Sequence, residues 1–315
     1  MRSTLLISES HYGTSKKVAD ILSLVIGPAR HVEIDEELPE VSKYNNIVLV
    51  LGFYGFNTAE KLKEYLSSTK DTLKNKRIAI VGVGLTEKDT NNYILSIEKV
   101  MDREADIVDF VQGEIKVDKL TKDDKKILKA FLKEKRIPLT DMGNLNNKEI
   151  LDVGSKLAKV FNKPNNEMIK KELKSEINKF IEIHNTCTLA TGSGDFVRNT
   201  PIEYTYYKDK FYFISEGGLK FKGILQNPNV CISIFNSYTS MNELKGMQIS
   251  GESEIIPCWS EEYTELIKVK GLNAEVLKNL PINLNLIKVI PEVFEFLNTD
   301  FKEKGMDSKQ YYFVN

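Results

Sequence analysis

The stretch "SESHYGTSKK" at residues 8–17 gathers hydroxyl groups where an apolar, strand-like run gives way to a helical pattern. The first N–H groups of a helix have no intrahelical partner and lie at its positive end, so a phosphate group is stabilised there. Gly13 allows the backbone to wrap closely, and Ser10, Thr14 and Ser15 can donate hydrogen bonds. The loop therefore favours anion binding. The competing interpretation is that Ser15 only caps the helix.

A second set of polar residues lies within residues 198–235, where Arg198, Ser215, Lys220 and Lys222 occupy strand ends or the turn after "FYFISE". If the strands pair about the "KDK" turn, Arg198 and the "SEGGLK" turn come to the same end of a hairpin. Arg and Lys would hold a phosphate there through charge-assisted hydrogen bonds, and Ser215 and the glycine backbone would complete the cradle. The competing interpretation is a set of solvated surface charges.

The first half of the chain contains the elements that position the first loop. Apolar runs rich in Ile and Val predict strands of a parallel sheet buried on both faces, at residues 3–7, 45–52, 76–84 and 105–113. Amphipathic periodicity predicts helices, at residues 16–27, 58–68, 91–101, 121–136 and 146–161. The alternation predicts an α/β doubly wound parallel sheet over residues 1–162. Such sheets bind ligands outside the carboxyl ends of their strands, where the loop would lie.

The pattern changes at "FNKPNNEM" (161–168), where we place the linker to a second domain at residues 163–315. One helix is predicted at 167–184. Short alternating strands follow, at residues 186–192, 198–207, 210–216, 230–236 and 246–256. A last run at 283–298 contains Pro291, which predicts an edge or a bulge. Turn residues separate the strands, so we expect an antiparallel sheet that closes into a small barrel.

The first loop and its surroundings resemble the flavodoxin family over about the first 160 residues. The residues that carry the resemblance are Ser10, Tyr12, Gly13, Ser15, Lys17, Val18 and Ala19, together with the segment 113–131. The resemblance implies FMN, with its phosphate on the loop and its ring between segments 52–59 and 82–89. The implied FMN-binding residues are Ser10, His11, Tyr12, Gly13, Thr14, Ser15, Phe53, Tyr54, Gly55, Gly82 and Gly84. Neither G-x-x-x-x-G-K-[ST] nor G-x-G-x-x-G occurs in the loop, which disfavours a P-loop NTPase and a Rossmann dinucleotide site.

Residues 167–315 resemble the pyridoxamine 5'-phosphate oxidase-like FMN-binding split barrels. The resemblance is carried by Arg198, Pro201, Ile202, Tyr204, Phe211, Phe213, Ser215, Lys220, Ile224, Asn227, Pro228 and Val230. It implies an FMN at the interface of a homodimer, with Tyr238 or Asn242 supplied by the second subunit. The implied cofactor-binding residues are Arg198, Pro201, Ile202, Glu203, Tyr204, Ser215, Glu216, Gly217, Lys220, Lys222 and Gln248. The Arg and His set that would recognise pyridoxamine phosphate is not identified.

These resemblances imply an FMN-dependent oxidoreductase, or electron-transfer flavoprotein, with an FMN in the barrel and a second in the flavodoxin-like half. The barrel flavin would accept a hydride from NAD(P)H, and electrons would pass to the flavodoxin-like half and on to a redox partner. One alternative is a single-FMN protein whose flavodoxin-like half is degenerate. Another is a flavodoxin-like oxidase of a bulky substrate such as a porphyrinogen. No catalytic residue is assigned.

The composition limits the other classes of function. A formal net charge of -1 over 315 residues gives no basic field for nucleic acid. The three cysteines form no C-x-x-C pair, and none of the three histidines has metal-ligand spacing, so no metal is expected. No apolar run approaches the ~18 residues of a membrane span, and the start has no signal-peptide core. We therefore expect a cytoplasmic protein that does not enter a membrane.

Overall fold

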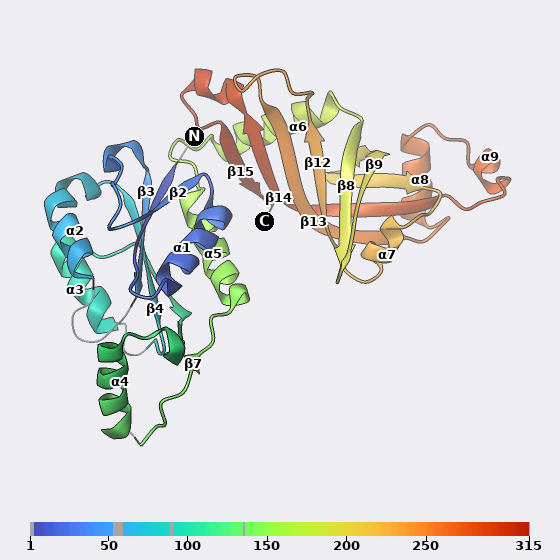
Figure 1. Ribbon diagram of the computed structural model, residues 1–315. Coiled ribbons are helices and arrows are strands. Elements are labelled where there is room, and N and C mark those ends of the chain that lie inside the picture. The colour runs from blue at the N-terminus through green and yellow to red at the C-terminus, as the bar shows by residue number, and fades with distance from the viewer. Residues whose placement is uncertain (1–2, 53–58, 88–90, 135, 315) are drawn as a thin grey trace. The chain divides into compact units, whose positions relative to one another are not determined.

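The computed structural model describes residues 3–52, 59–87, 91–134 and 136–314. The chain divides into two compact units, Met1–Lys163 and Pro164–Asn315. Buried apolar clusters form separately within each unit, so each unit is described by itself (Figure 1). Within the described ranges, no helix combines the length and the apolar character needed to cross a bilayer.

The first unit is built on a five-stranded parallel sheet in the order β2-β1-β3-β4-β5. Its strands are β1 (Thr4–Glu9), β2 (Ala29–Glu33), β3 (Asn46–Gly52), β4 (Arg77–Gly84) and β5 (Ile107–Gln112). Its main helices are α1 (Thr14–Ile26), α2 (Glu60–Leu73), α3 (Asn91–Met101) and α5 (Asn147–Phe161), with a 3-10 turn, η1 (Val41–Lys43). The predicted doubly wound sheet is confirmed. Strand β2 was not predicted, because only Val32 of its five residues is buried.

Helices cover both faces of this sheet (Figure 1). Helix α1 buries Val18, Ala19, Leu22 and Ile26, which recur at helical spacing, against the face that α5 also covers. Helices α2 and α3 cover the opposite face. Since both faces are covered, the strands are apolar along their whole length, as the sequence indicates.

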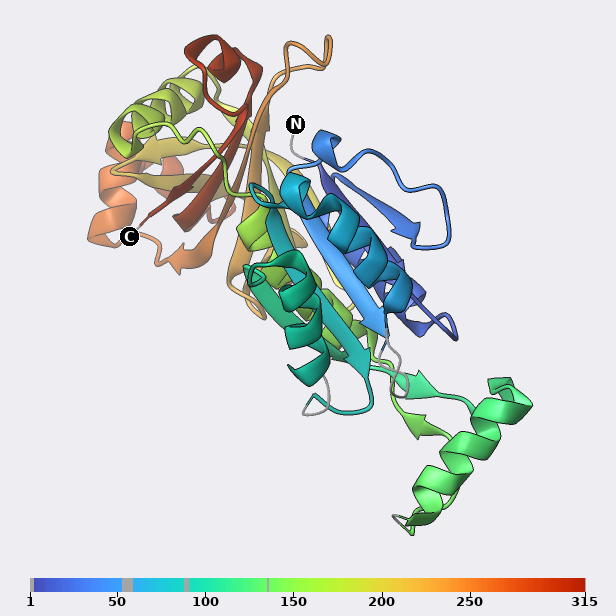
Figure 2. The ribbon, with the colours of Figure 1, turned by 90° about the vertical axis from the view of Figure 1, so that its left-hand side faces the viewer.

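Residues 113–145 form an excursion from the sheet, between β5 and α5. It contains β6 (Glu114–Ile115), η2 (Val117–Lys119), α4 (Lys122–Glu134) and β7 (Met142–Gly143), and β6 pairs with β7 in antiparallel fashion. Figure 2 shows α4 extending away from the sheet. The excursion brings a second segment of chain to the end of the sheet where the loop after β1 lies.

The second unit is a curled antiparallel sheet in the order β10-β11-β14-β13-β12-β8-β9, with β15 also paired to β14. Its strands are β8 (Thr186–Ser193), β9 (Phe196–Glu203), β10 (Thr205–Tyr207), β11 (Lys210–Ser215), β12 (Asn229–Phe235), β13 (Lys245–Ile256), β14 (Asn285–Asn298) and β15 (Lys309–Phe313). Its helices are α6 (Lys170–Glu182), α7 (Lys220–Ile224), α8 (Glu261–Val269) and α9 (Ala274–Lys278), with a 3-10 helix, η3 (Thr299–Lys304). The curled half-barrel is consistent with the predicted split barrel. The sequence did not predict the helices α7, α8, α9 and η3, and it did not predict strand β15.

Strand β14 is central in this sheet, although its Pro291 suggested an edge or a bulge. The strand pairs with β11 before Pro291, at Asn285–Val289, and with β15 after it, at Val293–Leu297. The ladder to β13 shifts register between Ser250 and Gly251, opposite the proline. The bulge is therefore present. Pro291, which has no N–H, falls where β14 exchanges β11 for β15 as its partner on one side, while its pairing with Gly251 of β13 continues on the other.

Candidate functional site

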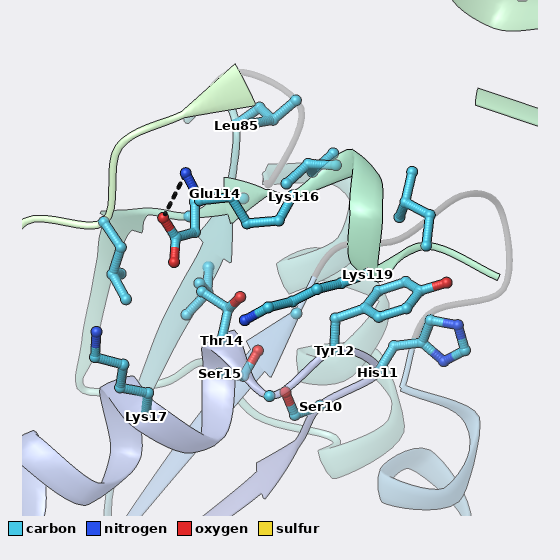
Figure 3. Close-up of a pocket in the computed structure, with 18 residues that line it drawn as sticks. Ser10, His11, Tyr12, Thr14, Ser15, Lys17, Leu85, Glu114, Lys116 and Lys119 are labelled. Carbon is cyan, nitrogen blue, oxygen red and sulfur yellow. Dashed lines mark ion pairs between the residues drawn. The ribbon is translucent and has the colours of Figure 1, made fainter. Parts of the chain in front are cut away.

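The carboxyl ends of β1, β3 and β4 open into a cavity of about 260 Å³ (Figure 3). The loop from Ser10 to Ser15 forms one wall, and residues 113–116, Lys119 and Leu120 of the excursion form another. The lining is completed by Lys17, Gly52, Val83, Gly84, Leu85 and Leu145. The cavity thus has a hydroxyl-rich side, where α1 begins, and an apolar side.

The loop after β1 presents unpaired hydrogen-bond donors to this cavity. Gly13 precedes α1 with a φ of 85°, a left-handed conformation that favours glycine, and no side chain caps the helix. Ser15 lies inside the first turn and is 2% exposed, so it is not the helix cap. Within the described residues, no hydrogen bond is made by the hydroxyls of Ser10, Thr14 or Ser15. The anion-binding interpretation therefore fits the loop better than the capping one.

The side chains of His11 and Tyr12 turn from the loop toward the excursion. The Tyr12 hydroxyl donates to an Asp124 carboxylate oxygen, and His11 Nε2 lies 3.1 Å from the same Oδ2 atom. The N–H of Thr121 donates to the Tyr12 hydroxyl at 3.1 Å. These contacts attach the start of α4 to the loop. We interpret His11 and Tyr12 as residues that shape the cavity wall, since their polar atoms already bind protein groups.

Lysines of the cavity differ in their partners. Lys116 Nζ lies 3.6 Å from Glu114 Oε2 and 3.4 Å from Asp141 Oδ2, so its charge is balanced by two carboxylates. No ion pair within the described residues involves Lys17 or Lys119. Sequence reasoning did not select Lys116, Lys119 or Leu120. The only signal was the position of "GEIKVDKL" directly after the last strand of the sheet.

The residues expected around a flavin ring are only partly described. Phe53, Tyr54 and Gly55 lie outside the described residues. Gly84 lines the cavity, whereas Gly82 is buried inside β4 and does not line it. Gly52, which was not selected, approaches Ser15 closely, because a Cβ atom there would lie 2.7 Å from the Ser15 hydroxyl.

A polar relay, buried at Ser8 and exposed at Asp20, supports the strand that leads into the loop. Ser8 Oγ lies 2.8 Å from His31 Nε2, and His31 Nδ1 lies 2.7 Å from Asp20 Oδ1. Since a carboxylate only accepts, Nδ1 carries a proton and donates to Asp20, and Nε2 shares the second hydrogen bond with the Ser8 hydroxyl. Serine hydrolases have the same Ser–His–Asp order of contacts in their active sites. Ser8 is 0% exposed, however, so a substrate cannot reach its hydroxyl. The relay ties β1, β2 and α1 together.

Replacing His31 with Leu is expected to destabilise the first unit by about 1–3 kcal/mol, because the buried Ser8 hydroxyl loses its partner. Ser8→Ala leaves His31 Nε2 without a partner and costs a similar amount. The double variant should cost less than the sum of the two single changes, which thermal unfolding followed by circular dichroism will measure. Additive effects would contradict the relay.

The second unit holds a buried ammonium group at the turn after β11. Lys220 is 8% exposed and donates to the carbonyl of Gly217, whose N–H is bonded to Ser215 Oγ at 3.2 Å. Gly217 has a φ of 124°, which directs its carbonyl into this turn. Burial, and next the positive charge of Arg198, lower the pKa of Lys220. The Glu216 carboxylate offsets part of this effect, but neither Lys220 nor Arg198 forms an ion pair within the described residues, so the two cations can hold an anion.

Arg198 reaches this turn by a route that differs from the predicted one. Pairing about the "KDK" turn stops after three pairs, Thr205–Tyr207 with Lys210–Tyr212, so it does not include Arg198. Arg198 instead pairs with Thr191 of β8, against which α7 packs. The sequence alone does not predict this packing, because α7 has only five residues and no helical signal of its own.

The other predicted residues of the second unit lie around this centre or away from it. Lys222 is exposed, with its Nζ 4.8 Å from the centroid of the Phe196 ring. Tyr204 is a core residue whose hydroxyl donates to the carbonyls of Ile181 and His184 at 2.7 and 2.9 Å. Its hydroxyl is thus occupied by protein groups, and a cofactor contact of Tyr204 stays a prediction.

Five further predicted residues are placed as follows. Ile202 packs against the core, and Glu203 pairs with Lys270 at 2.9 Å. Pro201 and Glu216 are exposed. Gln248 is also exposed, in a cross-strand row with Ser233 and Glu295 on the outward face of the sheet. Arg198, Ser215, Gly217 and Lys220 are therefore the residues that the fold gathers.

Comparison with known families agrees with both folds. Residues 5–138 match the flavodoxin domain, and residues 173–297 match pyridoxamine 5'-phosphate oxidase. This chain joins a flavodoxin domain to a pyridoxamine 5'-phosphate oxidase-like domain. Both families support flavin binding, and the unpaired polar groups in the flavodoxin domain and in the oxidase-like domain fit the phosphate of FMN.

Solved structures with similarity to the chain include three bacterial proteins. A Listeria innocua protein named as a pyridoxamine 5'-phosphate oxidase is 25% identical, with a TM-score of 0.33, and the match covers 40% of this chain and 98% of that one. A Clostridium acetobutylicum NimC/NimA family protein is 22% identical, with a TM-score of 0.32 and coverage of 46% and 94%. The heme storage protein HutZ of Vibrio cholerae is 18% identical, with a TM-score of 0.33 and coverage of 38% and 90%. A search of curated proteins gave no significant match.

Proposed function

We propose that this chain is an FMN-dependent oxidoreductase with one FMN in each domain. The oxidase-like domain would take a hydride from a reduced nicotinamide, and the flavodoxin domain would pass electrons to a redox partner. The observation that carries the proposal is that each domain leaves donors open for a ligand. In one domain they are the hydroxyls of Ser10, Thr14 and Ser15, and in the other they are the cations Arg198 and Lys220, which form no ion pair within the described residues. Such groups are costly to bury unless a ligand satisfies them.

In the flavodoxin domain, the hydroxyls of Ser10, Thr14 and Ser15 and the first N–H groups of α1 would hold the phosphate. The apolar residues of the cavity, Val83, Leu85, Leu120 and Leu145, would exclude water from the rest of the ligand. Bound FMN would supply the redox chemistry, because its ring exchanges a hydride or single electrons. The chain itself binds and orients the flavin.

In the oxidase-like domain, Lys220 and Arg198 would hold the second phosphate as charge-assisted donors. Ser215 fixes the turn by accepting from the Gly217 N–H and donating to the Gly217 carbonyl at 3.1 Å. This leaves the Lys220 ammonium with a single carbonyl partner, so two of its three protons remain for the ligand.

The oxidase-like domain is also proposed to form a homodimer through the outward face of its sheet. Large apolar side chains are exposed on that face, namely Val197 (80%), Phe235 (59%) and Phe313 (55%). Polar residues such as Gln248 and Glu295 lie on the same face, and exposed apolar side chains among polar ones fit a protein interface. Analytical ultracentrifugation should give twice the chain mass of 35.9 kDa, and Phe235→Lys should weaken the dimer without unfolding the domain. A monomeric parent protein would contradict the interface.

The test of the function is flavin content together with anaerobic reduction. Two FMN per chain, bleached by NADH or NADPH in stopped flow, are expected. Ser15→Val should remove one FMN and Lys220→Met the other. One FMN that survives Ser15→Val would favour the single-FMN alternative. Absence of flavin would contradict the proposal, and oxidation of a porphyrinogen by the flavin-loaded protein, without reduction by either nicotinamide, would favour the bulky-substrate alternative.

A further inference from the structure

Two lysines of the flavodoxin-domain cavity, Lys17 and Lys119, make no ion pair within the described residues, and Lys119 is the one on the wall opposite the loop of Ser10 to Ser15. It lines the cavity from η2, and Figure 3 shows its side chain extending toward Thr14 and Ser15 on the opposite wall. Its neighbour Lys116 is balanced by Glu114 and Asp141, whereas no ion pair within the described residues involves Lys119. Lys119 is exposed, and no carboxylate of the described part of the chain forms an ion pair with it.

The groups that Lys119 faces are donors without a protein partner. Ser15 is 2% exposed and its hydroxyl makes no hydrogen bond with described residues, so the cradle is built and desolvated on that side. Hydroxyls and backbone N–H groups supply partial charges only. A phosphate monoester at pH 7 carries about -1.5 to -2 charges. A full positive charge opposite the hydroxyls would balance the phosphate charge, which the partial charges of the loop do not.

The position of Lys119 relative to the loop is held by hydrogen bonds. Asp124, at the start of α4, accepts from Tyr12 of the loop and from Thr121 Oγ1 at 2.8 Å. At the other side of η2, the Val117 N–H donates to Asp141 at 2.9 Å. Both ends of the short segment that carries Lys119 are therefore anchored, which limits the entropy lost when Lys119 binds a ligand.

We infer that Lys119 is the residue that makes this cavity select phosphorylated flavin over unphosphorylated flavin. The inference rests on the proposed function, and goes beyond it by assigning the charge selectivity to one side chain of the excursion. The ligand class is a flavin with a terminal phosphate dianion. Riboflavin has the same ring and no phosphate, so it would make every contact except those of the phosphate.

The test measures dissociation constants of FMN and riboflavin by quenching of flavin fluorescence. It uses the full chain carrying Lys220→Met, so that the second flavin site does not mask the first. Lys119→Gln should raise the dissociation constant of FMN by about 10-fold or more, as expected for a lost hydrogen bond to a charged group. It should raise the dissociation constant of riboflavin by less than about 2-fold. Lys119→Arg, which keeps the charge, should restore FMN binding to within about 3-fold.

The matched control is Lys122→Gln, which removes the same charge from the excursion at a residue that does not line the cavity. It should change neither constant by more than about 2-fold at physiological salt, where exposed charges are screened. Unchanged FMN binding in Lys119→Gln, equal weakening of FMN and riboflavin, or an equal effect of Lys122→Gln would overturn the inference and leave the proposed function standing. Absence of FMN binding by the Lys220→Met chain would overturn both.

Discussion

Lys220→Met is expected to raise the dissociation constant of FMN in the oxidase-like domain by about 10- to 100-fold, because a hydrogen bond to a charged group contributes about 1.5–3 kcal/mol. Met is unbranched and one atom shorter than Lys, so it keeps most of the packing of the aliphatic stem, and the loss reports on the ammonium group. Removing a buried cation that repels Arg198 should also raise the stability of the flavin-free domain. Equilibrium dialysis with FMN gives the constant, and urea unfolding gives the stability.

The matched control for Lys220→Met is Lys222→Met, in the same short helix. Lys222 is exposed and lies over the Phe196 ring, so its replacement should raise the dissociation constant of FMN by less than about 3-fold. Equal effects of the two substitutions would show that the general positive field binds the phosphate, and the cradle built on Lys220 would then be wrong.

The same residue gives the affinity a pH dependence. Burial and Arg198 lower the pKa of Lys220 below its ordinary 10.5 in the flavin-free protein, and a bound phosphate favours the protonated form. FMN affinity should therefore be level near neutral pH and fall as the pH rises through the lowered pKa. Lys220→Arg should move this fall to higher pH, because a guanidinium stays charged. The stability of the flavin-free domain changes with pH in the opposite direction. The buried charge lowers its free energy of unfolding in full below the lowered pKa, and this cost disappears as the pH rises toward 10.5 and above.

Gly251→Ala is expected to destabilise the oxidase-like domain by about 3 kcal/mol or more, which is the upper range for overpacking. A Cβ atom at residue 251 would lie 2.3 Å from the Ile290 carbonyl oxygen and 3.0 Å from Pro291 Cα. Both are backbone atoms of the central strand β14, so they cannot rotate away. Urea unfolding followed by the fluorescence of Trp259, the single tryptophan of the chain, reports on this domain alone.

Gly246→Ala, in the same strand β13, is the control for Gly251→Ala. The nearest atom to its Cβ would be Phe235 Cβ at 3.4 Å, an ordinary contact. Its effect should stay within about 0.5 kcal/mol, as for most surface substitutions. If both substitutions changed stability equally, the contact at the bulge would not be the cause, and a general intolerance of β13 to side chains would explain the result.

Most of the fold followed from local patterns. The apolar runs of β1, β3 and β4 were recognised because strands buried on both faces leave a continuous hydrophobic signal. Strand β2 has one buried residue, and α7 has five residues in all, so neither leaves a periodic signal long enough to detect. Helix boundaries shifted by a few residues. One such shift decided the role of Ser15, which lies in the first turn of α1.

The sites followed from the sequence only where their residues are neighbours along the chain. Ser10 to Ser15 and Ser215 to Lys220 are each contiguous, so their residue types and a helix or turn sufficed. Tyr204 matches the motif and packs in the core, where its hydroxyl is bonded to the carbonyl of Ile181 in α6 and to that of His184 just after the helix. A motif constrains which residues are present, and packing decides which way each side chain points.

By itself the sequence determined the two domains, their fold classes and the two clusters of phosphate-binding residue types, since these depend on periodicity and on adjacent residues. Only the tertiary structure decided that Lys119 faces the loop of Ser10 to Ser15 and that Arg198 lies beside Lys220. Tyr12 and Asp124, which join the loop to the excursion, are 112 residues apart in the chain. Arg198 reaches its site through pairing with β8 and the packing of α7. Such contacts arise when cores close and strands choose partners, and their free energies belong to no single segment of the chain.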